Sequence, residues 1–184
     1  AKLKEKAIEI EANINAANEY AKWGALYTVI NYCNTVISYA PGVRQLDPDF
    51  SEKELKQYLA EAKAIRAFCY FTLVRTFKNV PYVEEPYNDD SRPFAVAQST
   101  EEEILESLMM DLRSIENDAV EEYTSIVNNK GRITRKAVWS LMADIALWRN
   151  DFQTCIEYCD KILDATTNQL VLERASVYYK QNFF

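Results

Sequence analysis

The sequence predicts an all-α fold built from tetratricopeptide-like helical hairpins with long connecting loops. Three glycines and five prolines in 184 residues leave little room for the many tight turns of an all-β protein. Apolar residues recur at steps of three and four through most of the chain, which is the spacing of an amphipathic helix. Ser51 with Glu54 and Thr100 with Glu103 have the capping-box pattern that marks a helix start.

Composition places the chain among globular proteins. Hydrophobic residues make up 48% and charged residues 27%, so we expect residues 1–184 to form a single helical domain with its own core. The net charge of -7 disfavours nucleic-acid binding, because such a chain repels a phosphate backbone. No apolar run approaches the roughly 20 residues of a membrane span.

Catalytic chemistry finds little support in the sequence. Histidine is absent, which removes the commonest general base and the commonest metal ligand. No two glycines lie close enough together to form a phosphate-binding loop. We therefore expect a binding or docking scaffold that is not an enzyme and that holds no cofactor and no metal.

The N-terminal half divides into three expected helices. The first covers residues 3–17, and the second covers 21–40 and ends at Pro41-Gly42. A loop over 42–50 follows. The third helix covers 51–77 and stops before Pro81.

The middle of the chain is expected to contain a long connection. Residues 78–99 hold three prolines and several aromatic residues, and a loop of this length is usually functional or pinned by its aromatic side chains. The next helix starts after Thr100 and reaches Ile115. Residues 118–131 are polar and rich in turn-forming residues.

The C-terminal third contains the clearest hairpin. Helices over 134–149 and 152–165 share the short turn at Asn150-Asp151, so they must be antiparallel neighbours. Small alanines lie among larger residues in this pair, as in a tetratricopeptide repeat. The helices over 21–40 and 51–77 suit a similar, longer pair. A last helical stretch is expected from about residue 173.

Most of the special residue types have a structural interpretation. We expect the cysteines to be small buried thiols; they are Cys33, Cys69, Cys155 and Cys159. Core packing is also expected for four aromatic residues, Trp23, Tyr27, Phe68 and Phe77, whereas Trp148 lies near a loop and should be partly exposed. Arg66 and Arg75 interrupt an apolar pattern, which predicts structural ion pairs, with Glu61 as a candidate partner.

Acidic clusters offer the remaining candidates for chemistry. Glu101, Glu102 and Glu103 begin a helix, where they stabilise its dipole. Carboxylates also lie in loops, at Asp47, Asp49, Asp89 and Asp90, and paired loop carboxylates can act as acid and base or bind calcium. Neither loop pair has the regular ligand spacing of a calcium loop.

The run EAKAIRAFCYFTLVRTFKNVP, from Glu61 to Pro81, resembles the hallmark helix of the SusD/RagB family. That pattern has an acidic residue, an Arg-Ala pair, two aromatics, Leu, then Phe-Gly and a Val-Pro exit. Two more segments resemble the same family. Its second signature is similar to the run from Gly131 to Ala137 together with Asn150-Asp151-Phe152. The family's first helix is matched by Trp23, Leu26-Tyr27, Ile30 and Asn34. Lys78 and Arg149 depart from the family, which often has glycine at both positions.

The resemblance implies a nutrient-binding lipoprotein at the surface of the outer membrane of Gram-negative bacteria. Such proteins bind oligosaccharides or polysaccharides, or in some members peptides, and act as lids on a TonB-dependent, SusC-like outer-membrane transporter. They are anchored to the membrane only by a lipid on an N-terminal cysteine, which this chain lacks. Family members are several hundred residues long, so we expect this chain to be an N-terminal fragment that provides the helical scaffold and transporter-docking face.

Candidate ligand contacts lie in the two expected loops. Arg44, Asp47 and Asp49 are polar groups suited to hydrogen-bonding sugar hydroxyls, and Tyr82 and Tyr87 offer rings that stack on a pyranose face. An alternative is a tetratricopeptide-like adaptor that binds other proteins. The irregular loop over 78–99 argues against that alternative, because it interrupts any constant repeat.

Overall fold

The computed structural model describes residues 22–88 and 95–164, and these residues form helices joined by loops and one short strand pair. The helices are α2 (Gly24–Leu46), α3 (Glu52–Phe77), α4 (Glu101–Ile115), α5 (Ile126–Gly131), α6 (Arg135–Trp148) and α7 (Phe152–Asp164). The strands are β1 (Val80–Pro81) and β2 (Gln98–Ser99). The expected helices over 3–17 and from 173 onward lie outside the described residues, as do Asp89 and Asp90.

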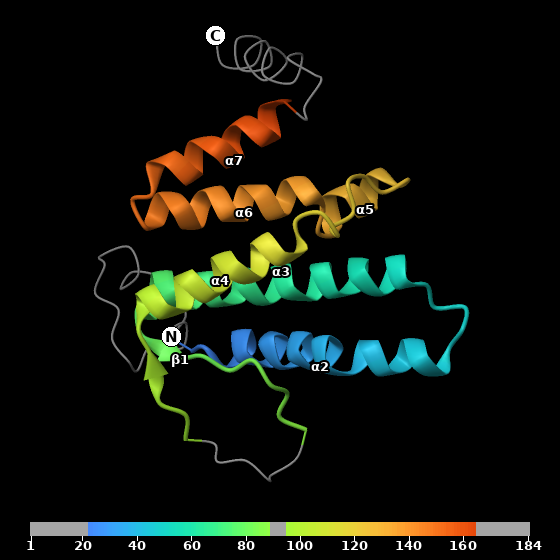
Figure 1. Cartoon of the computed structure of the whole chain (residues 1–184). Coiled ribbons are helices and arrows are strands. Elements are labelled where there is room, and N and C mark those ends of the chain that lie inside the picture. Colours follow the sequence, from blue (N-terminus) through green and yellow to red (C-terminus); the bar gives the residue numbers. More distant parts are fainter. Residues whose placement is uncertain (1–21, 89–94, 165–184) are drawn as a thin grey trace, which may run out of the picture.

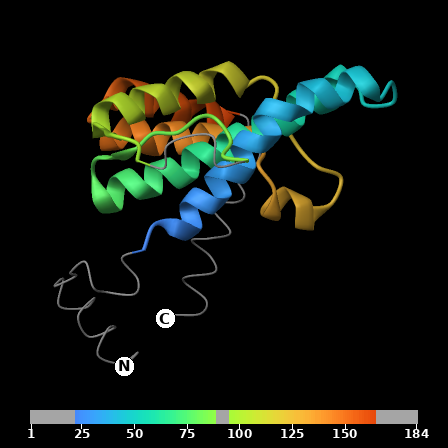
Figure 2. The same ribbon diagram turned by 90° about the horizontal axis from the view of Figure 1, so that it is seen from below.

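The helices stack as successive layers (Figure 1). Helix α2 packs on α3, α3 packs on α4, and α6 packs on α7, with α4 also touching α6. The α2–α3 and α6–α7 pairs are the helical hairpins that the sequence predicts, and the all-α, tetratricopeptide-like fold is confirmed. Figure 2 shows that the tip of the α2–α3 hairpin projects beyond the remaining helices.

The core gathers around α3, which lies between α2 on one side and α4 on the other. The large buried side chains of the core come mainly from α3, α4 and α6, together with Ile30 of α2, and include Tyr70, Leu73, Leu108, Leu112, Met142 and Ile145. The apolar faces of these helices are therefore buried against one another, which is the main source of stability for a helical stack.

Both expected capping boxes are present, and Thr134 caps a third helix. The Ser51 and Thr100 side chains each accept a hydrogen bond from the backbone N–H three residues on. In turn, the Glu54 and Glu103 carboxylates accept a hydrogen bond from the backbone N–H of the cap residue. The hydrogen bonds from Thr100 hold the pKa of Glu103 below its ordinary value. Thr134 caps α6 by accepting from the Ala137 N–H at 3.3 Å.

We expect Thr100→Ala to lower the free energy of unfolding by about 1 kcal/mol, because the start of α4 loses its cap. Urea denaturation followed by circular dichroism measures the change. Thr76→Ala is the matched control, since Thr76 is an exposed residue in the last turn of α3 whose hydroxyl only bonds the carbonyl of Thr72. Equal losses in the two variants would contradict the assigned capping role.

The predicted end of the second helix at Pro41-Gly42 is wrong. Helix α2 continues through Pro41 to Leu46, and Gly42 has no positive φ that would mark a helix end. Proline removes one helical N–H bond, but Pro41 is exposed, so water can reach the carbonyl left without that partner. Arg44 consequently lies in the last turn of α2 and not in a loop.

Two further features depart from the expected loops. Residues 126–131 form the short helix α5 inside the segment predicted as turns. Within the long connection, β1 and β2 pair antiparallel, with Val80 opposite Ser99 and Pro81 opposite Gln98. This pairing ties the beginning of the connection to its end.

Lys78 ends α3 with φ of 67°, a backbone conformation that a side chain disfavours. The same conformation explains a glycine preference at this position, because glycine has no Cβ to clash. Lys78 compensates through its side chain: the ammonium lies 3.2 Å from Glu101 and over the Trp148 ring. Trp148 itself is partly exposed, as the sequence predicts.

Burial was mispredicted for some aromatic and thiol side chains. Cys33 and Cys69 are buried as expected, but Cys155 is half-buried and Cys159 is exposed. Tyr27 and Phe77 pack against the core, whereas Phe68 is 59% exposed and Trp23 is also exposed. Helical spacing shows that residues share a face, but it does not show which face a neighbouring helix covers.

Candidate ligand-binding site

The first stretch of the long connection, residues 81–88, is fastened to α2 and α3 by tyrosine hydroxyls. The Tyr27 hydroxyl donates to the Pro81 carbonyl at 2.6 Å. The Tyr70 hydroxyl donates to the Val83 carbonyl at 2.9 Å and accepts from the Val83 N–H at 2.7 Å. Because Tyr70 is fully buried, these bonds tie the loop to the core.

Two asparagines on successive turns of α2 hold the same loop. Asn31 pairs with the backbone of Tyr87, donating from its amide to the carbonyl at 3.2 Å and accepting the N–H at 2.7 Å. Asn34 donates to the Val83 carbonyl at 3.0 Å and is itself almost fully buried. The loop backbone thus uses α2 side chains as partners, much as a strand uses its neighbour.

Beneath the loop lies a buried charge cluster centred on Arg66. Its guanidinium donates to Asn34 at 2.9 Å, to Glu84 at 3.4 Å and to Asp111 of α4. Lys63 contacts the same Asp111 carboxylate at 3.0 Å. Burial is the largest single influence on Arg66 and lowers its pKa, but the hydrogen bond to Asp111 and the nearby negative charges together outweigh burial and raise the pKa above its ordinary value.

The predicted ion pairs of α3 are therefore real, but Glu61 is not the partner of either arginine. Glu61 instead pairs with Arg132, at the start of the α6 region, at 2.5 Å. Arg75 pairs with Asp144 of α6 at 3.2 Å. All three pairs join residues that are far apart in sequence.

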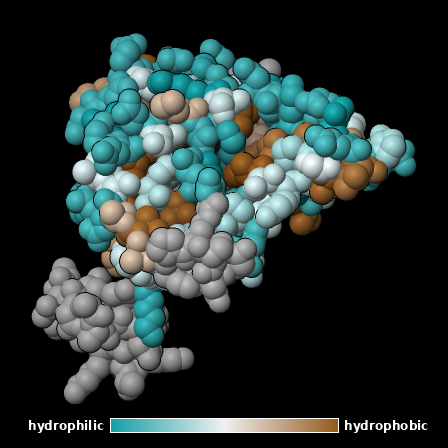
Figure 3. All heavy atoms as spheres, turned by 60° about the horizontal axis from the view of Figure 1, so that its bottom comes forward, coloured by the Kyte–Doolittle hydropathy of each residue, from teal (hydrophilic) through white to brown (hydrophobic). Residues whose placement is uncertain are grey.

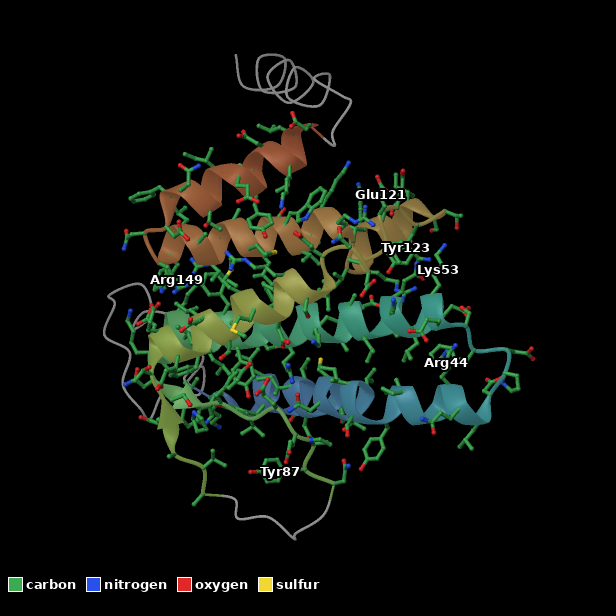
Figure 4. All side chains as sticks on the ribbon, viewed as in Figure 1. Arg44, Lys53, Tyr87, Glu121, Tyr123 and Arg149 are labelled. Carbon is green, nitrogen blue, oxygen red and sulfur yellow. The ribbon has the colours of Figure 1, made fainter. Side chains whose placement is uncertain are left out.

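Two shallow hollows lie between α2 and the loop, and Tyr27, Val83 and Tyr87 line both. One has a volume of ≈ 310 Å³ and is lined by Trp23, Tyr27, Pro81, Val83, Tyr87 and Val96. The other, of ≈ 420 Å³, adds polar groups from Thr28, Asn31 and Asn34 together with the ring of Tyr32. We call the two together the aromatic hollow. Figure 4 shows Tyr87 on the loop beside α2.

The aromatic hollow offers rings and neutral hydrogen-bonding groups. Burial raises the pKa of Tyr27 to about 12, so this hydroxyl stays protonated at physiological pH and keeps its bond to the Pro81 carbonyl, while its oxygen can still accept a hydrogen bond. Amide groups and protonated hydroxyls hydrogen-bond neutral polar ligands, while exposed ring faces pack on apolar ones. This combination suits a ligand with hydroxyls around an apolar face, and it includes no nucleophile paired with a base.

A second cavity is larger and of different character. It has a volume of ≈ 620 Å³ and lies between the start of α3 and residues 117–122. Its lining is strongly charged, with Lys53, Lys56 and Arg135 facing Glu52, Asp118, Glu121 and Glu122. The opposite charges in this polar cleft partly compensate one another, as in the 3.5 Å pair of Arg135 with Glu121.

The structure separates the five candidate contacts into two groups. Tyr82 and Tyr87 lie in the loop beside α2, while Arg44 lies 13 residues beyond Asn31, about 20 Å along the helix axis. Arg44 pairs with Glu52 at 3.2 Å, and Asp47 accepts from the Asp49 N–H at 3.0 Å. The hairpin tip and the loop therefore do not form one site.

Tyr82 and Tyr87 also differ from each other. The Tyr82 ring packs on Tyr70 with centroids 4.7 Å apart, and burial raises its pKa strongly. Tyr87 lines both parts of the aromatic hollow. Of the predicted contacts, Tyr87 is the one that borders this hollow.

Sequence reasoning missed the residues of α2 that build the aromatic hollow. Asn31, Asn34 and Tyr27 lie at steps of three and four, so a polar face on an otherwise apolar helix was a usable signal. Tyr32 is the other missed ring.

Within residues 22–88 and 95–164, no helix is both long enough and apolar enough to cross a membrane. The same residues contain no group of three or more acidic or cysteine side chains arranged to hold a metal ion.

The family described as "Starch-binding associating with outer membrane", SusD-like, matches residues 3–147. The chain belongs to the SusD-like family. A SusD-like protein of Formosa agariphila, P2, is 26% identical over 144 residues, which cover 78% of this chain and 27% of that protein. The chain spans about a quarter of the length of the curated SusD-like relatives that it matches.

Solved structures of SusD-like proteins share the fold. Surface glycan-binding protein A from Bacteroides fluxus is 28% identical, with a TM-score of 0.68 over 84% of this chain and 32% of that one. A SusD-like carbohydrate-binding protein from Bacteroides fragilis superposes with a TM-score of 0.73, covers 85% of this chain and 29% of that one, and is 23% identical. The helical stack is thus a shared part of longer proteins.

Proposed function

We propose that this chain takes part in glycan binding at the outer-membrane surface and that the aromatic hollow contacts the sugar. The observation that carries the proposal is the pairing of the Tyr27 and Tyr87 rings with the Asn31 and Thr28 side chains around one hollow. A pyranose has an apolar face that stacks on a ring and hydroxyls that bond amides. Membership of the SusD-like family supports the same ligand class.

The proposal uses Tyr87 as a sugar contact and the buried bonds beneath it as support. Asn31 holds the Tyr87 backbone, and Asn34 with Arg66 fixes the loop that precedes it. A preorganised loop loses less conformational freedom when a ligand binds, so these bonds raise affinity in addition to the contact that the Asn31 side chain makes with the sugar. Arg44, Asp47 and Asp49 lie at the hairpin tip, and the Tyr82 ring packs on Tyr70, so the proposed contact does not include them.

A partner at the membrane completes the proposal. We propose that the protein is a binding subunit, not an enzyme, and that it delivers glycan to a TonB-dependent transporter of the outer membrane. The stack of hairpins supplies the rigid scaffold, because each helix is braced by the next one along the chain.

We expect Tyr87→Ala to weaken glycan binding about tenfold, equal to roughly 1.4 kcal/mol, because the stacking ring is lost. Affinity electrophoresis in gels that contain soluble starch, laminarin or other polysaccharides first identifies a glycan that retards the protein. Titration calorimetry with an oligosaccharide of that glycan then compares the variants.

Tyr58→Ala is the matched control for this experiment. Tyr58 is an exposed tyrosine whereas Tyr87 is half-buried, and Tyr58 lies on α3 toward the hairpin tip, where its ring meets Phe50. Binding that falls equally in the two variants would place the sugar elsewhere. Absence of retardation in every gel would count against glycan binding by this part of the protein.

A further inference from the structure

The solvent-facing side of α2 lacks charge. No Asp, Glu, Lys or Arg occurs in the 21 residues from Trp23 to Val43, although 27% of the chain is charged. A surface helix normally carries charged residues on its outer face. An exposed face without them is typical of the centre of a protein–protein interface, where charged residues are depleted and tyrosine is enriched.

Six exposed apolar residues form one stripe along this face. They are Val29, Tyr32, Val36, Tyr39, Val43 and Leu46, and we call them the α2 stripe. Their exposed fractions range from 37% at Val29 to 87% at Leu46. Figure 3, in which the α2 side comes forward, shows apolar patches among hydrophilic ones on this face toward the hairpin tip.

The spacing of the α2 stripe is that of a coiled-coil seam. Successive members are separated by three, four, three, four and three residues, so the stripe follows the a and d positions of a heptad. Valine occupies all three a positions, and the d positions hold two tyrosines and a leucine. A helix with such a seam fits against a second helix with matching holes.

The order of small and large residues makes the stripe complementary to itself. In an antiparallel pair centred between Val36 and Tyr39, Val36 of one copy meets Tyr39 of the other. The next layers pair Tyr32 with Val43 and Val29 with Leu46. Every valine then faces a larger side chain, so two copies interdigitate about a twofold axis.

Charge also favours a second copy at this face over other faces of the molecule. A net charge of -7 makes copies repel one another wherever their surfaces are acidic. The α2 stripe buries no charged group on pairing, and so it avoids the cost of desolvating one. Six partly exposed side chains per copy bury on the order of 1,000 Å² in total, which is at the low end for a specific interface.

We propose that the α2 stripe is a self-association surface through which two copies of this chain form an antiparallel, concentration-dependent dimer. The inference does not rest on glycan binding, because the stripe is defined by its own spacing, exposure and lack of charge, although its member Tyr32 also lines the aromatic hollow. Tyr39 also accepts a hydrogen bond from Asn88 at 2.9 Å, so one ring of the seam is held in place before pairing.

Sedimentation equilibrium over a wide range of protein concentration tests this proposal. We expect the weight-average mass to rise from 21.3 kDa toward twice that value in the native chain. Val36→Glu places two carboxylates near the twofold axis and should keep the protein monomeric. Gln45→Glu adds the same charge to an exposed position of α2 outside the stripe and should leave the dimer intact.

A monomer at every concentration, or a dimer that Val36→Glu leaves unchanged, would overturn the proposal. Circular dichroism of each variant verifies that the helices persist. The antiparallel arrangement has its own test, made in a Cys159→Ser background because Cys159 is exposed. Val29→Cys combined with Leu46→Cys should form a disulfide-linked dimer on oxidation, while Val29→Cys alone should not. Equal cross-linking of the single variant would contradict antiparallel pairing.

Discussion

Asp111→Ala is expected to lower the free energy of unfolding by about 3 to 5 kcal/mol, the largest effect of any substitution considered for this protein. The loss arises because Arg66, with a side chain only 3% exposed, would keep its charge without its main counter-ion. Glu84 does not replace Asp111, since its carboxylate lies 3.4 Å away and is 56% exposed. Urea denaturation followed by circular dichroism measures the change.

Asp144→Ala is the control, because it also removes an aspartate from an arginine of α3. The Arg75–Asp144 pair is about half exposed on both sides, so we expect a loss below about 1 kcal/mol. Similar losses in the two variants would show that burial does not set the strength of these pairs. The double variant Arg66→Met/Asp111→Ala should be more stable than Asp111→Ala, because it removes the orphaned charge.

The contrast between these pairs shows where sequence reasoning succeeds and where it stops. The capping boxes at Ser51 and Thr100 were predictable because cap and partner lie three residues apart and depend on local geometry alone. The α6–α7 hairpin was predictable because a short turn leaves two helices no other arrangement. The partner of Arg66, in contrast, lies 45 residues away on α4, and only the packing of α3 against α4 selects Asp111.

The candidate site shows the same contrast between local features, which the sequence predicts, and long-range contacts, which it does not. The loop over 78–99 was recognisable from its prolines and tyrosines, and Tyr87 was among the residues chosen there. Tyr82 and Tyr87 cannot be distinguished by residue type, because the difference lies in how the loop is held: Tyr82 packs on Tyr70, whereas the Tyr87 backbone is bound by Asn31. The other wall of the hollow comes from α2, for example Asn34, which lies 49 residues before Val83.

Pro41 illustrates a third limit. Pro-Gly is a strong turn signal, yet α2 passes through it, since helical propensity is weak compared with the packing of a long hairpin. The error placed Arg44 in a loop, although it lies in the last turn of α2. In the structure Arg44 pairs with Glu52 across the hairpin tip, where it joins the end of α2 to the start of α3.

Asn34→Leu should lower the free energy of unfolding by about 2 to 3 kcal/mol, although leucine is close to asparagine in size. Asn34 is 1% exposed, and its carbonyl oxygen accepts from Arg66 at 2.9 Å. Leucine leaves that charged donor without its neutral partner, and a buried hydrogen bond to a charged group contributes about 1.5 to 3 kcal/mol. The Val83 carbonyl retains the Tyr70 hydroxyl, so most of the cost falls on Arg66.

Asn31→Leu, one turn before Asn34 in α2, distinguishes an effect on the stability of the fold from an effect on the position of the loop. Asn31 is only half-buried, so water can replace its bonds to Tyr87 and the stability loss should stay near 1 kcal/mol. Its effect on glycan affinity should nevertheless match that of Asn34→Leu or exceed it, because Asn31 holds the proposed contact directly. Thermal unfolding and titration calorimetry on both variants give the two readouts. If affinity followed stability alone, the loop would not position Tyr87 for a ligand, and the role proposed for the two asparagines would fail.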